Sequence, residues 1–289
     1  MSFALYTDSF SNLPGRLLTQ LNIHALPCTY MIDGETHSYN GDIENFDAKA
    51  YYDQMRQGKM ITTTLINAQQ FTDHFRPSLE QGLDVVYVGL SSGVSGTYQA
   101  AAMAAAELME EFPGRRVRTV DSLGAGLGTG LLTCLGADCR EQGMTADETA
   151  DKLDQERLRL CEYFTVGSLT YLRRTGRVSA ATAAIGNVLN IKPLLYGDYE
   201  GHIVACEKYR GRNKVTDAIV ERYRRKVVDA ASQRVFISHG DCEEEALALA
   251  ERVRAIAQPK ELIICPHEPL TGSHVGPGML ALFFLGDSR

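Results

Sequence analysis

The chain has 289 residues, of which 44% are hydrophobic and 22% charged, and its formal net charge is −7. These values are ordinary for a globular protein, and the length predicts one large or two medium domains, of which we expect two. No apolar run approaches the ~20 residues that cross a bilayer, so we expect no integral membrane segment. The net negative charge gives no overall attraction to nucleic acid or to anionic lipid.

The start of the chain and its cysteines indicate the compartment. Residues 1–8 lack a basic region and already include Asp8, which argues against a signal peptide. The seven cysteines are scattered, with no Cys-x-x-Cys pair, and so predict neither a disulfide framework nor a metal site. We therefore expect a cytoplasmic protein whose thiols are reduced and mostly buried.

The first part of the chain alternates strand-like and helix-like segments. Apolar runs predict strands over residues 3–7, 25–32, 84–90 and 116–120. Helical patterns predict helices over residues 12–21, 46–56 (opened by Asn45), 69–79 (opened by Asn67), 97–110 and 125–140. Thr145 and Glu148 form a capping box before a charged helix that reaches about residue 160. This order predicts an α/β domain with a largely parallel sheet over residues 1–160.

The second part has a different rhythm. Strands are predicted over residues 163–167, 191–196, 202–208, 235–238, 262–265 and 279–285, and residues 197–201 form a hairpin turn between the second and third. Helices are predicted over residues 179–189, 212–230 and 242–257, the last capped by Asp241. These elements predict an α+β domain with a mixed or antiparallel sheet over residues 161–289.

Hydroxyls and glycines cluster in residues 90–99, between an apolar strand and an alanine-rich helix. Free backbone N–H groups and the positive end of the helix dipole meet at such a junction, and Ser95 and Thr97 add hydroxyl donors. Gly93 and Gly96 let the backbone approach a ligand closely. This pattern is typical of a site for a carboxylate or phosphate, and the alternative is that Ser95 only caps the helix.

Two nucleotide-site patterns are missing. Residues 124–130 are glycine-rich, but a Gly-x-Gly-x-x-Gly fingerprint would need a glycine at position 129 or 131, which are Thr129 and Leu131. No Gly-Lys-Ser/Thr phosphate loop occurs in the chain. We therefore expect no nucleotide cofactor, and expect these glycines to permit close helix packing or the passage of a slender apolar group.

Ser95 also has an alternative interpretation, as the nucleophile of a serine hydrolase acting on an acyl ester. The Gly-x-Ser-x-Gly elbow is absent, because Thr97 stands two residues after the serine. His239, His267 and His274, with several aspartates, are available to complete a triad in space.

Lysine and arginine crowd into residues 208–226. This run is either a locally basic surface or the solvated face of a helix.

Six segments of the chain, in order, resemble motifs of the DegV family, bacterial fatty-acid-binding proteins that present a bound acyl chain to a separate fatty-acid kinase. The segments are residues 7–14, 91–98, 120–122 with the glycines that follow, 171–178, 191–195 and 272–278. The resemblance implies a two-domain fold with the ligand between the domains, a carrier subunit rather than a catalyst, and no cofactor. It also implies two partners, a long-chain fatty acid and the kinase subunit.

The resemblance further implies which residues bind the fatty-acid carboxylate. They are Thr63, Ser95, Gly96, Thr97 and His274. The family usually shows Thr-Ser-Gln-Pro-Ser where this chain has residues 63–67, so the first threonine is kept and the Gln and Pro are lost. His274 is expected in a loop that leads into the last strand.

Arg173 and Arg210 lie in segments that resemble family motifs. Basic residues outside an apolar pocket suit contact with an acidic partner, so we expect both to face the kinase. The alternative is that they pair with acids of their own chain.

Overall fold

The computed structural model describes residues 3–178 and 190–289, and the predicted helix over residues 179–189 lies outside these ranges. The strands are β1 (Phe3–Asp8), β2 (Ile23–Leu26), β3 (Cys28–Ile32), β4 (Glu35–Tyr39), β5 (Ile61–Thr63), β6 (Asp84–Gly89), β7 (Val117–Asp121), β8 (Leu160–Thr165), β9 (Ile191–Gly197), β10 (Ile203–Arg210), β11 (Arg234–His239), β12 (Glu261–Pro266) and β13 (Leu280–Leu285). The helices are α1 (Gly15–Gln20), α2 (Ala48–Arg56), α3 (Ala68–Glu80), α4 (Thr97–Glu111), α5 (Leu127–Glu141), α6 (Ala146–Glu156), α7 (Thr170–Thr175), α9 (Arg212–Lys226), α10 (Glu243–Ile256) and α11 (Pro269–Val275). Short 3-10 turns are η1 (Ser9–Ser11), η2 (Arg157–Arg159) and η3 (Ala230–Ser232).

The strands form three sheets. Sheet A has the order β2-β1-β6-β7 and is parallel throughout. Sheet C has the order β10-β9-β8-β13-β11-β12 and is mixed, since β11 and β12 run parallel and the other neighbours antiparallel. Sheet B is a small antiparallel sheet of order β4-β3-β5. The predicted architecture, a parallel sheet followed by a mixed one, is confirmed.

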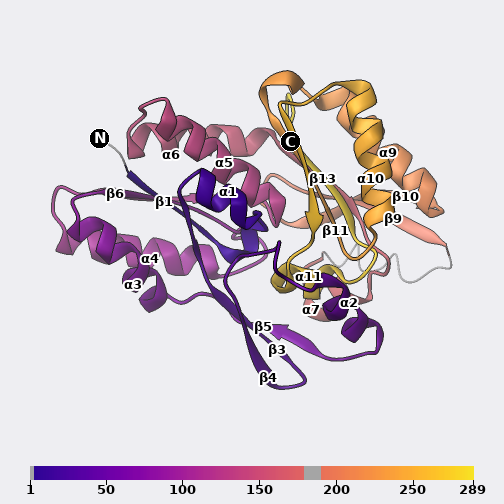
Figure 1. Ribbon diagram of the computed structural model, residues 1–289, viewed down its shortest axis with the longest axis horizontal. Coiled ribbons are helices and arrows are strands. Elements are labelled where there is room, and N and C mark those ends of the chain that lie inside the picture. The colour runs from indigo at the N-terminus through magenta and orange to yellow at the C-terminus, as the bar shows by residue number, and fades with distance from the viewer. Residues whose placement is uncertain (1–2, 179–189) are drawn as a thin grey trace.

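Helix α5 lies between the two large sheets (Figure 1) and contacts β1 and β6 of sheet A and β8, β11 and β13 of sheet C. Eleven of its fifteen residues are buried, as expected of a helix covered on all sides. Helices α3 and α4 cover the opposite face of sheet A, and α9 and α10 cover the outer face of sheet C. Helix α5 packs against both large sheets and so joins the two parts of the chain. The domain boundary after residue 160 therefore stays a prediction.

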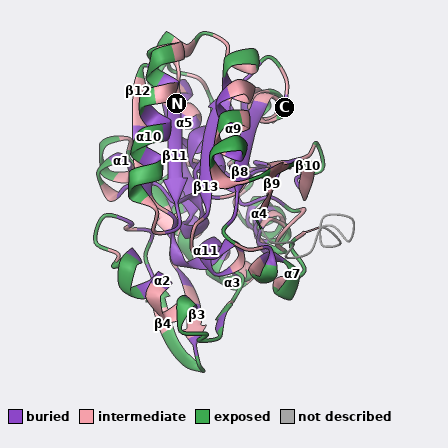
Figure 2. Cartoon of the chain, turned by 90° about the vertical axis from the view of Figure 1, so that its right-hand side faces the viewer, coloured by how far each residue is buried: buried purple, intermediate pink, exposed green. Residues whose placement is uncertain are grey.

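The alternation of side chains along β8 and β13 defines two faces of sheet C. Phe283 on β13 lies opposite Glu162 on β8, and Ala281 lies opposite Phe164, all on the face toward α5. Leu280, Leu282 and Phe284 alternate with these residues along β13 and pack on the other face, against α9 and α10. Figure 2 shows this sheet as a buried layer behind helices whose outer sides are exposed.

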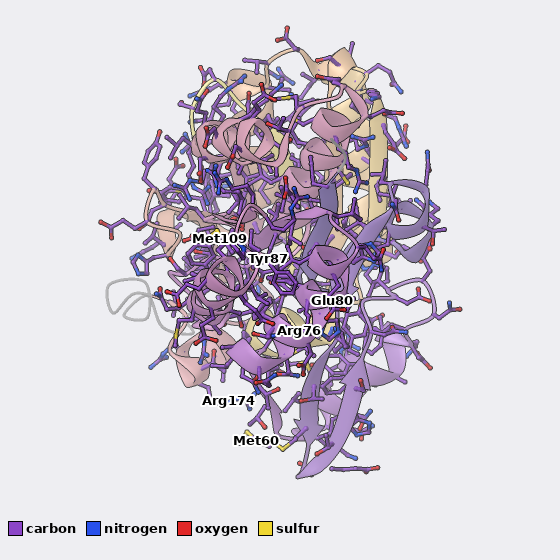
Figure 3. The ribbon with its side chains drawn as sticks, turned by 90° about the vertical axis from the view of Figure 1, so that its left-hand side faces the viewer. Met60, Arg76, Glu80, Tyr87, Met109 and Arg174 are labelled. Atoms are coloured by element: carbon purple, nitrogen blue, oxygen red, sulfur yellow. The ribbon has the colours of Figure 1, made fainter. Side chains whose placement is uncertain are left out.

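The order of sheet A creates a topological switch point between β1 and β6. The chain leaves β1 to form β2 on one side, and β6 later joins the other side of β1. In open parallel sheets, ligands bind in the crevice beyond the carboxyl ends of strands at such a point. Phe10 after β1 and the turn Leu90–Gly96 after β6 both lie there. Tyr87 on β6 (Figure 3) is fully buried and donates to the Asp8 carboxylate at 2.6 Å, which fixes this edge.

Several predicted boundaries are wrong. Residues 25–32 form two strands in different sheets, because Pro27 between β2 and β3 has no N–H to continue a ladder. The first helix begins at Gly15 rather than residue 12, since Asn12 is left-handed with φ 57°. Helix α9 ends at Lys226, before the predicted residue 230.

Two predicted helix caps are also wrong. Asp47, not Asn45, caps α2 by accepting the Ala50 N–H at 2.9 Å. Asp241 is left-handed with φ 56° and pairs with Arg56, so it caps nothing. The predicted capping box of Thr145 with Glu148 is confirmed, and so is Asn67 as the residue that opens α3, where the structure adds a reciprocal bond with Gln70.

The other sequence features have plain structural roles. The glycine-rich segment permits close packing: a Cβ at Gly130 would lie 2.6 Å from the Ser11 carbonyl oxygen. Basic side chains between residues 208 and 226 form ion pairs, among them Arg212 with Glu245 and Arg222 with Glu207, which favours a solvated helix face. Five of the seven thiols are buried.

Candidate functional site

A largely apolar cavity lies where the carboxyl edge of sheet A meets sheet B and the inner face of sheet C. Its volume is about 1020 Å³, counting the open space at its mouth. The lining residues are Phe10, Thr63, Thr64, Leu65, Leu90, Val94, Ser95, Gly96, Ala125, Glu162, Phe164, Leu172, Arg177, Ile203, His267, Thr271, His274, Val275, Met279, Ala281 and Phe283. The lining comes from strands of sheets B and C and from the segments that follow β1 and β6 of sheet A, as is common for small-molecule sites between packed units.

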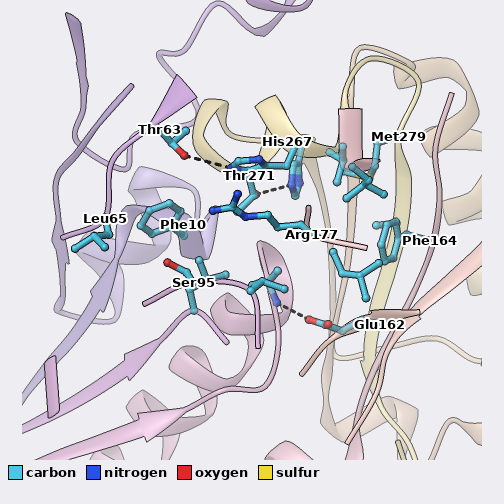
Figure 4. Close-up of a pocket in the computed structure, with 18 of the residues that line it drawn as sticks. Phe10, Thr63, Leu65, Ser95, Glu162, Phe164, Arg177, His267, Thr271 and Met279 are labelled. Atoms are coloured by element: carbon cyan, nitrogen blue, oxygen red, sulfur yellow. Dashed lines mark hydrogen bonds between the residues drawn. The ribbon is translucent and has the colours of Figure 1, made fainter. Parts of the chain in front are cut away.

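Thr63 lies at one end of the cavity (Figure 4), and His274 contacts it there. The Thr63 Oγ1 lies 3.2 Å from the His274 Nε2. Thr63 is on β5, an edge strand held by pairing with Tyr30 of β3, and His274 is in the last turn of α11. The expectation that His274 lies in a loop is therefore wrong, because Pro269 and the capping carboxylate of Glu268 begin a short helix there.

His274 is neutral at ordinary pH. Burial, with the charges of Arg177 and Arg174, lowers its pKa to about 4. Its Nδ1 is buried and has no hydrogen-bond partner in the described part of the chain. Because His274 lines the cavity, this ring nitrogen leaves that end of the cavity able to bond a ligand group.

Ser95, Gly96 and Thr97 take different positions. Ser95 and Gly96 line the cavity, and a Cβ at Gly96 would meet only Leu65, at 3.7 Å. Thr97 is fully buried and does not line the cavity. Its Oγ1 lies 3.0 Å from the Ser95 Oγ, and its N–H donates to that oxygen at 3.3 Å. Four of the five expected residues therefore reach the cavity, and Thr97 orients one of them.

Ser95 has no histidine partner among the described residues. His267 is engaged at both nitrogens, by the Ser238 hydroxyl at 2.9 Å and the Thr271 hydroxyl at 2.8 Å. Burial lowers the pKa of His267 to about 3, so it remains neutral. His239 accepts the Cys242 N–H at 3.3 Å. The arrangement that a serine hydrolase requires is not assembled around Ser95.

Two buried carboxyl groups hold the segments that carry the site. Asp8 accepts the Leu90 N–H and the Phe10 N–H, both at 3.1 Å, and burial raises its pKa to about 6. Glu268 accepts the Thr271 N–H at 2.8 Å and the Thr271 hydroxyl, and burial raises its pKa to about 8. Asp8 thereby holds the cavity-lining segments that follow β1 and β6, and Glu268 holds the start of α11.

Glu162 and Arg177 line the cavity but were missed as site residues. The predicted strand began at residue 163 and so excluded Glu162, although its position, two residues before Phe164, puts both on one face. Arg177 lies in residues 171–178, which the sequence marks only as a segment that resembles a family motif. The sequence signal for Glu162 is an acidic residue on the core-facing side of an apolar strand, where acids are rarely found.

Arg173 and Arg210 are both exposed. Arg173 follows the cavity-lining Leu172 on α7, and Arg210 ends β10. Neither forms an ion pair within residues 3–178 and 190–289, so the alternative of an own-chain acid partner gains no support there.

In these same ranges no cluster of three or more His, Cys, Asp or Glu side chains is arranged to hold a metal ion. Nor does any described helix have the length and apolar character needed to cross a membrane.

A parallel α/β unit and a mixed-sheet unit that together enclose an apolar cavity with a polar end define a class of ligand-binding protein. The model of the family described as "Uncharacterised protein, DegV family" matches residues 2–287, so the chain belongs to the DegV family. It is 37% identical to a DegV domain-containing protein of Clostridium perfringens, over 99% of this chain and 98% of that protein.

Solved structures share the whole fold. A DegV family protein from Thermus thermophilus, described for its fatty acid binding, is 29% identical with a TM-score of 0.88 and covers 99% of this chain and 100% of that one. DegV from Bacillus subtilis, described as a fatty acid binding protein, is 28% identical with a TM-score of 0.85 over the same shares of the two chains.

The raised pKa of Glu268 predicts a pH-dependent stability. Between its ordinary value of 4.5 and its folded value of about 8, the folded protein holds a proton that the unfolded chain has released. The free energy of unfolding therefore falls as the pH rises through this window. Between about pH 5 and pH 8, the free energy of unfolding of the wild type should fall by on the order of a few kcal/mol relative to that of Glu268→Gln, as measured by urea unfolding.

The control is Glu243→Gln, which alters an exposed acid in the first turn of α10. The difference in the free energy of unfolding between Glu243→Gln and the wild type should stay nearly constant with pH. A constant difference for Glu268→Gln as well would contradict the prediction.

Proposed function

We propose that this chain binds a long-chain fatty acid in the cavity and presents its carboxylate to a separate fatty-acid kinase. The observation that carries the proposal is the Thr63–His274 pair, 3.2 Å apart, at one end of a largely apolar cavity. The fatty-acid binding of the Thermus thermophilus and Bacillus subtilis relatives supports it. Thr63, Ser95, Gly96 and His274 bind the carboxylate, and Thr97 acts through Ser95.

The energetics of this ligand suit the cavity. Enclosing about 15 methylenes at ~0.8 kcal/mol each yields roughly 12 kcal/mol gross, before the cost of ordering the chain. A buried carboxylate is costly unless hydrogen bonds satisfy it. The hydroxyls of Thr63 and Ser95 and a ring N–H of neutral His274 are such donors, and the charges that lower the His274 pKa, those of Arg177 and Arg174, add positive potential.

The carrier role fits the surroundings of the cavity. The nucleotide needed for phosphorylation belongs to the kinase, since this chain has no phosphate-loop motif. Leu65 lines the cavity and is 51% exposed, so the carboxylate end lies near the surface. Arg173 and Arg210 face the acidic partner.

The decisive experiment is to identify what the purified protein carries. Organic extraction of freshly prepared protein, followed by mass spectrometry, should recover about one fatty acid per chain, and delipidated protein should take up palmitate or oleate in calorimetry. Absence of lipid in repeated extractions, together with no uptake of either acid, would refute the proposal.

Thr63→Val and Ser95→Ala should each weaken fatty-acid binding by about 1–3 kcal/mol, because each removes a donor to a buried carboxylate. Titration calorimetry of the delipidated variants with palmitate measures this loss. Thr62→Val and Ser92→Ala are matched controls, because both residues are exposed and do not line the cavity. Unchanged affinity in both site variants would place the head group elsewhere, and loss of chromogenic ester hydrolysis in Ser95→Ala would favour the hydrolase.

Arg173→Ala and Arg210→Ala should retain fatty acid while acyl phosphate formation by a cognate kinase falls at least about fivefold, as for loss of a charged contact at an interface. Arg116→Ala is the control, since Arg116 is exposed at the amino-terminal edge of sheet A, opposite the Ser95 turn. Full turnover in both variants would remove these arginines from the interface, and loss of lipid in both would assign them to the fold.

A further inference from the structure

A carboxyl group stands in the apolar wall of the cavity. Glu162 is the one acidic residue among the described residues of the lining, and it is only 8% exposed. Its neighbours on the same face of sheet C are Phe164 on its own strand and Phe283 opposite it on β13. Figure 4 shows Glu162 on the opposite side of the cavity from Thr63. It therefore lies away from the proposed carboxylate end, along the wall that an acyl tail would contact.

Three glycines make room for this carboxyl group. A Cβ at Gly128 would lie 1.7 Å from the Glu162 Oε1, and one at Gly124 would lie 2.5 Å from it. A Cβ at Gly197 would lie 2.8 Å from the Oε2. These contacts leave no space for any other residue at the three positions, so the local structure holds the acid in one place. They also explain part of the glycine-rich segment.

The hydrogen-bonding capacity of Glu162 is only partly used. Its Oε1 accepts the Ala125 N–H at 2.9 Å, which is its one hydrogen bond within the described residues. Arg289 brings its Nη2 no closer than 3.6 Å to the Oε2, because its guanidinium donates to the carbonyls of Gly197, Arg157 and Leu123. An ionised carboxylate accepts about four hydrogen bonds. Glu162 is therefore charge-compensated by its neighbour but retains free acceptor sites.

An unsubstituted acyl chain leaves the hydrogen-bonding capacity of Glu162 in this wall unused. Methylenes packed on Glu162 would exclude water without replacing its hydrogen bonds, and an unsatisfied buried acceptor is costly. A hydroxyl group suits it in either protonation state, since it donates to a carboxylate and accepts from a carboxylic acid. Burial raises the Glu162 pKa to about 7, so both forms occur near neutral pH.

We propose that Glu162 recognises a hydroxyl group on the tail of the ligand, so that the preferred fatty acids of this protein are hydroxy fatty acids. The inference rests on the proposed fatty-acid function and names the substrate class for the same cavity. A site built to bond a hydroxyl discriminates strongly against the analogue that lacks it, because its own polar group is then left unpaired.

The test is a calorimetric ligand series on delipidated wild-type protein. Stearate is compared with 10-hydroxystearate and 12-hydroxystearate, and palmitate with 16-hydroxypalmitate. At least one hydroxy acid should bind about tenfold or more tightly than its unsubstituted partner, as expected for a hydrogen bond to a charged group. Equal or weaker binding of every hydroxy acid would overturn the inference while leaving fatty-acid binding intact, whereas binding of no acid at all would overturn the proposed function with it.

Variants then assign the preference to Glu162. Glu162→Leu should abolish or reverse it, and Glu162→Gln should retain part of it, because an amide still bonds a hydroxyl. Glu244→Leu, which alters an exposed acid on α10, is the control and should leave it unchanged. If the leucine variant does not fold, the glutamine variant and the wild-type series still decide the matter. A preference that survives unchanged in Glu162→Gln and Glu162→Leu would overturn the inference.

Discussion

The burial of α5 between two sheets is the constraint on which the rest of the structure depends. A helix covered on both sides needs small residues wherever it meets backbone or a polar group, and Gly128 and Gly130 supply them against Glu162 and the Ser11 carbonyl. The same packing sets sheet C against the carboxyl edge of sheet A. The cavity forms at that junction, so its apolar wall comes from β8 and β13 and its polar end from the turns and helices around Thr63 and His274.

Buried carboxyl groups position this site without entering its polar end. Asp8 ties the ends of β1 and β6, and Glu268 begins the helix that carries His274. Each is deeply desolvated, so each must be fully hydrogen-bonded or protonated, and their raised pKa values reflect that burial. Ordered caps of this kind hold short elements such as α11, which has too few residues to be stable alone.

The sequence predicted the elements whose signals are local. The Thr145–Glu148 capping box, the Asn67 cap and the hairpin of β9 with β10 were visible because a few adjacent residues determine them. Tertiary contacts determine the others. Strand β5 is three residues long and exists through pairing with β3, and α11 follows a buried acid that sequence cannot distinguish from a surface one. Family resemblance identified Thr63 and His274 as residues of one carboxylate site, but the contact of 3.2 Å between them depends on tertiary packing, because 211 positions separate them.

The two ends of the cavity differ in electrostatic potential and in free hydrogen-bond donors, and this asymmetry bears on how a fatty acid would lie in it. Arg177 and Arg174 make the potential near His274 positive, as the lowered pKa of that histidine reflects. Glu162 has its carboxyl group on the opposite side. A fatty-acid carboxylate placed beside Glu162 would find no free donor there, because the Ala125 N–H already bonds the Glu162 Oε1 and the Arg289 guanidinium donates to backbone carbonyls. Reversed binding would therefore give up the donors at the His274 end and gain none beside Glu162, so the proposed orientation, with the carboxylate near the surface, is favoured by hydrogen bonding and by the positive potential near His274.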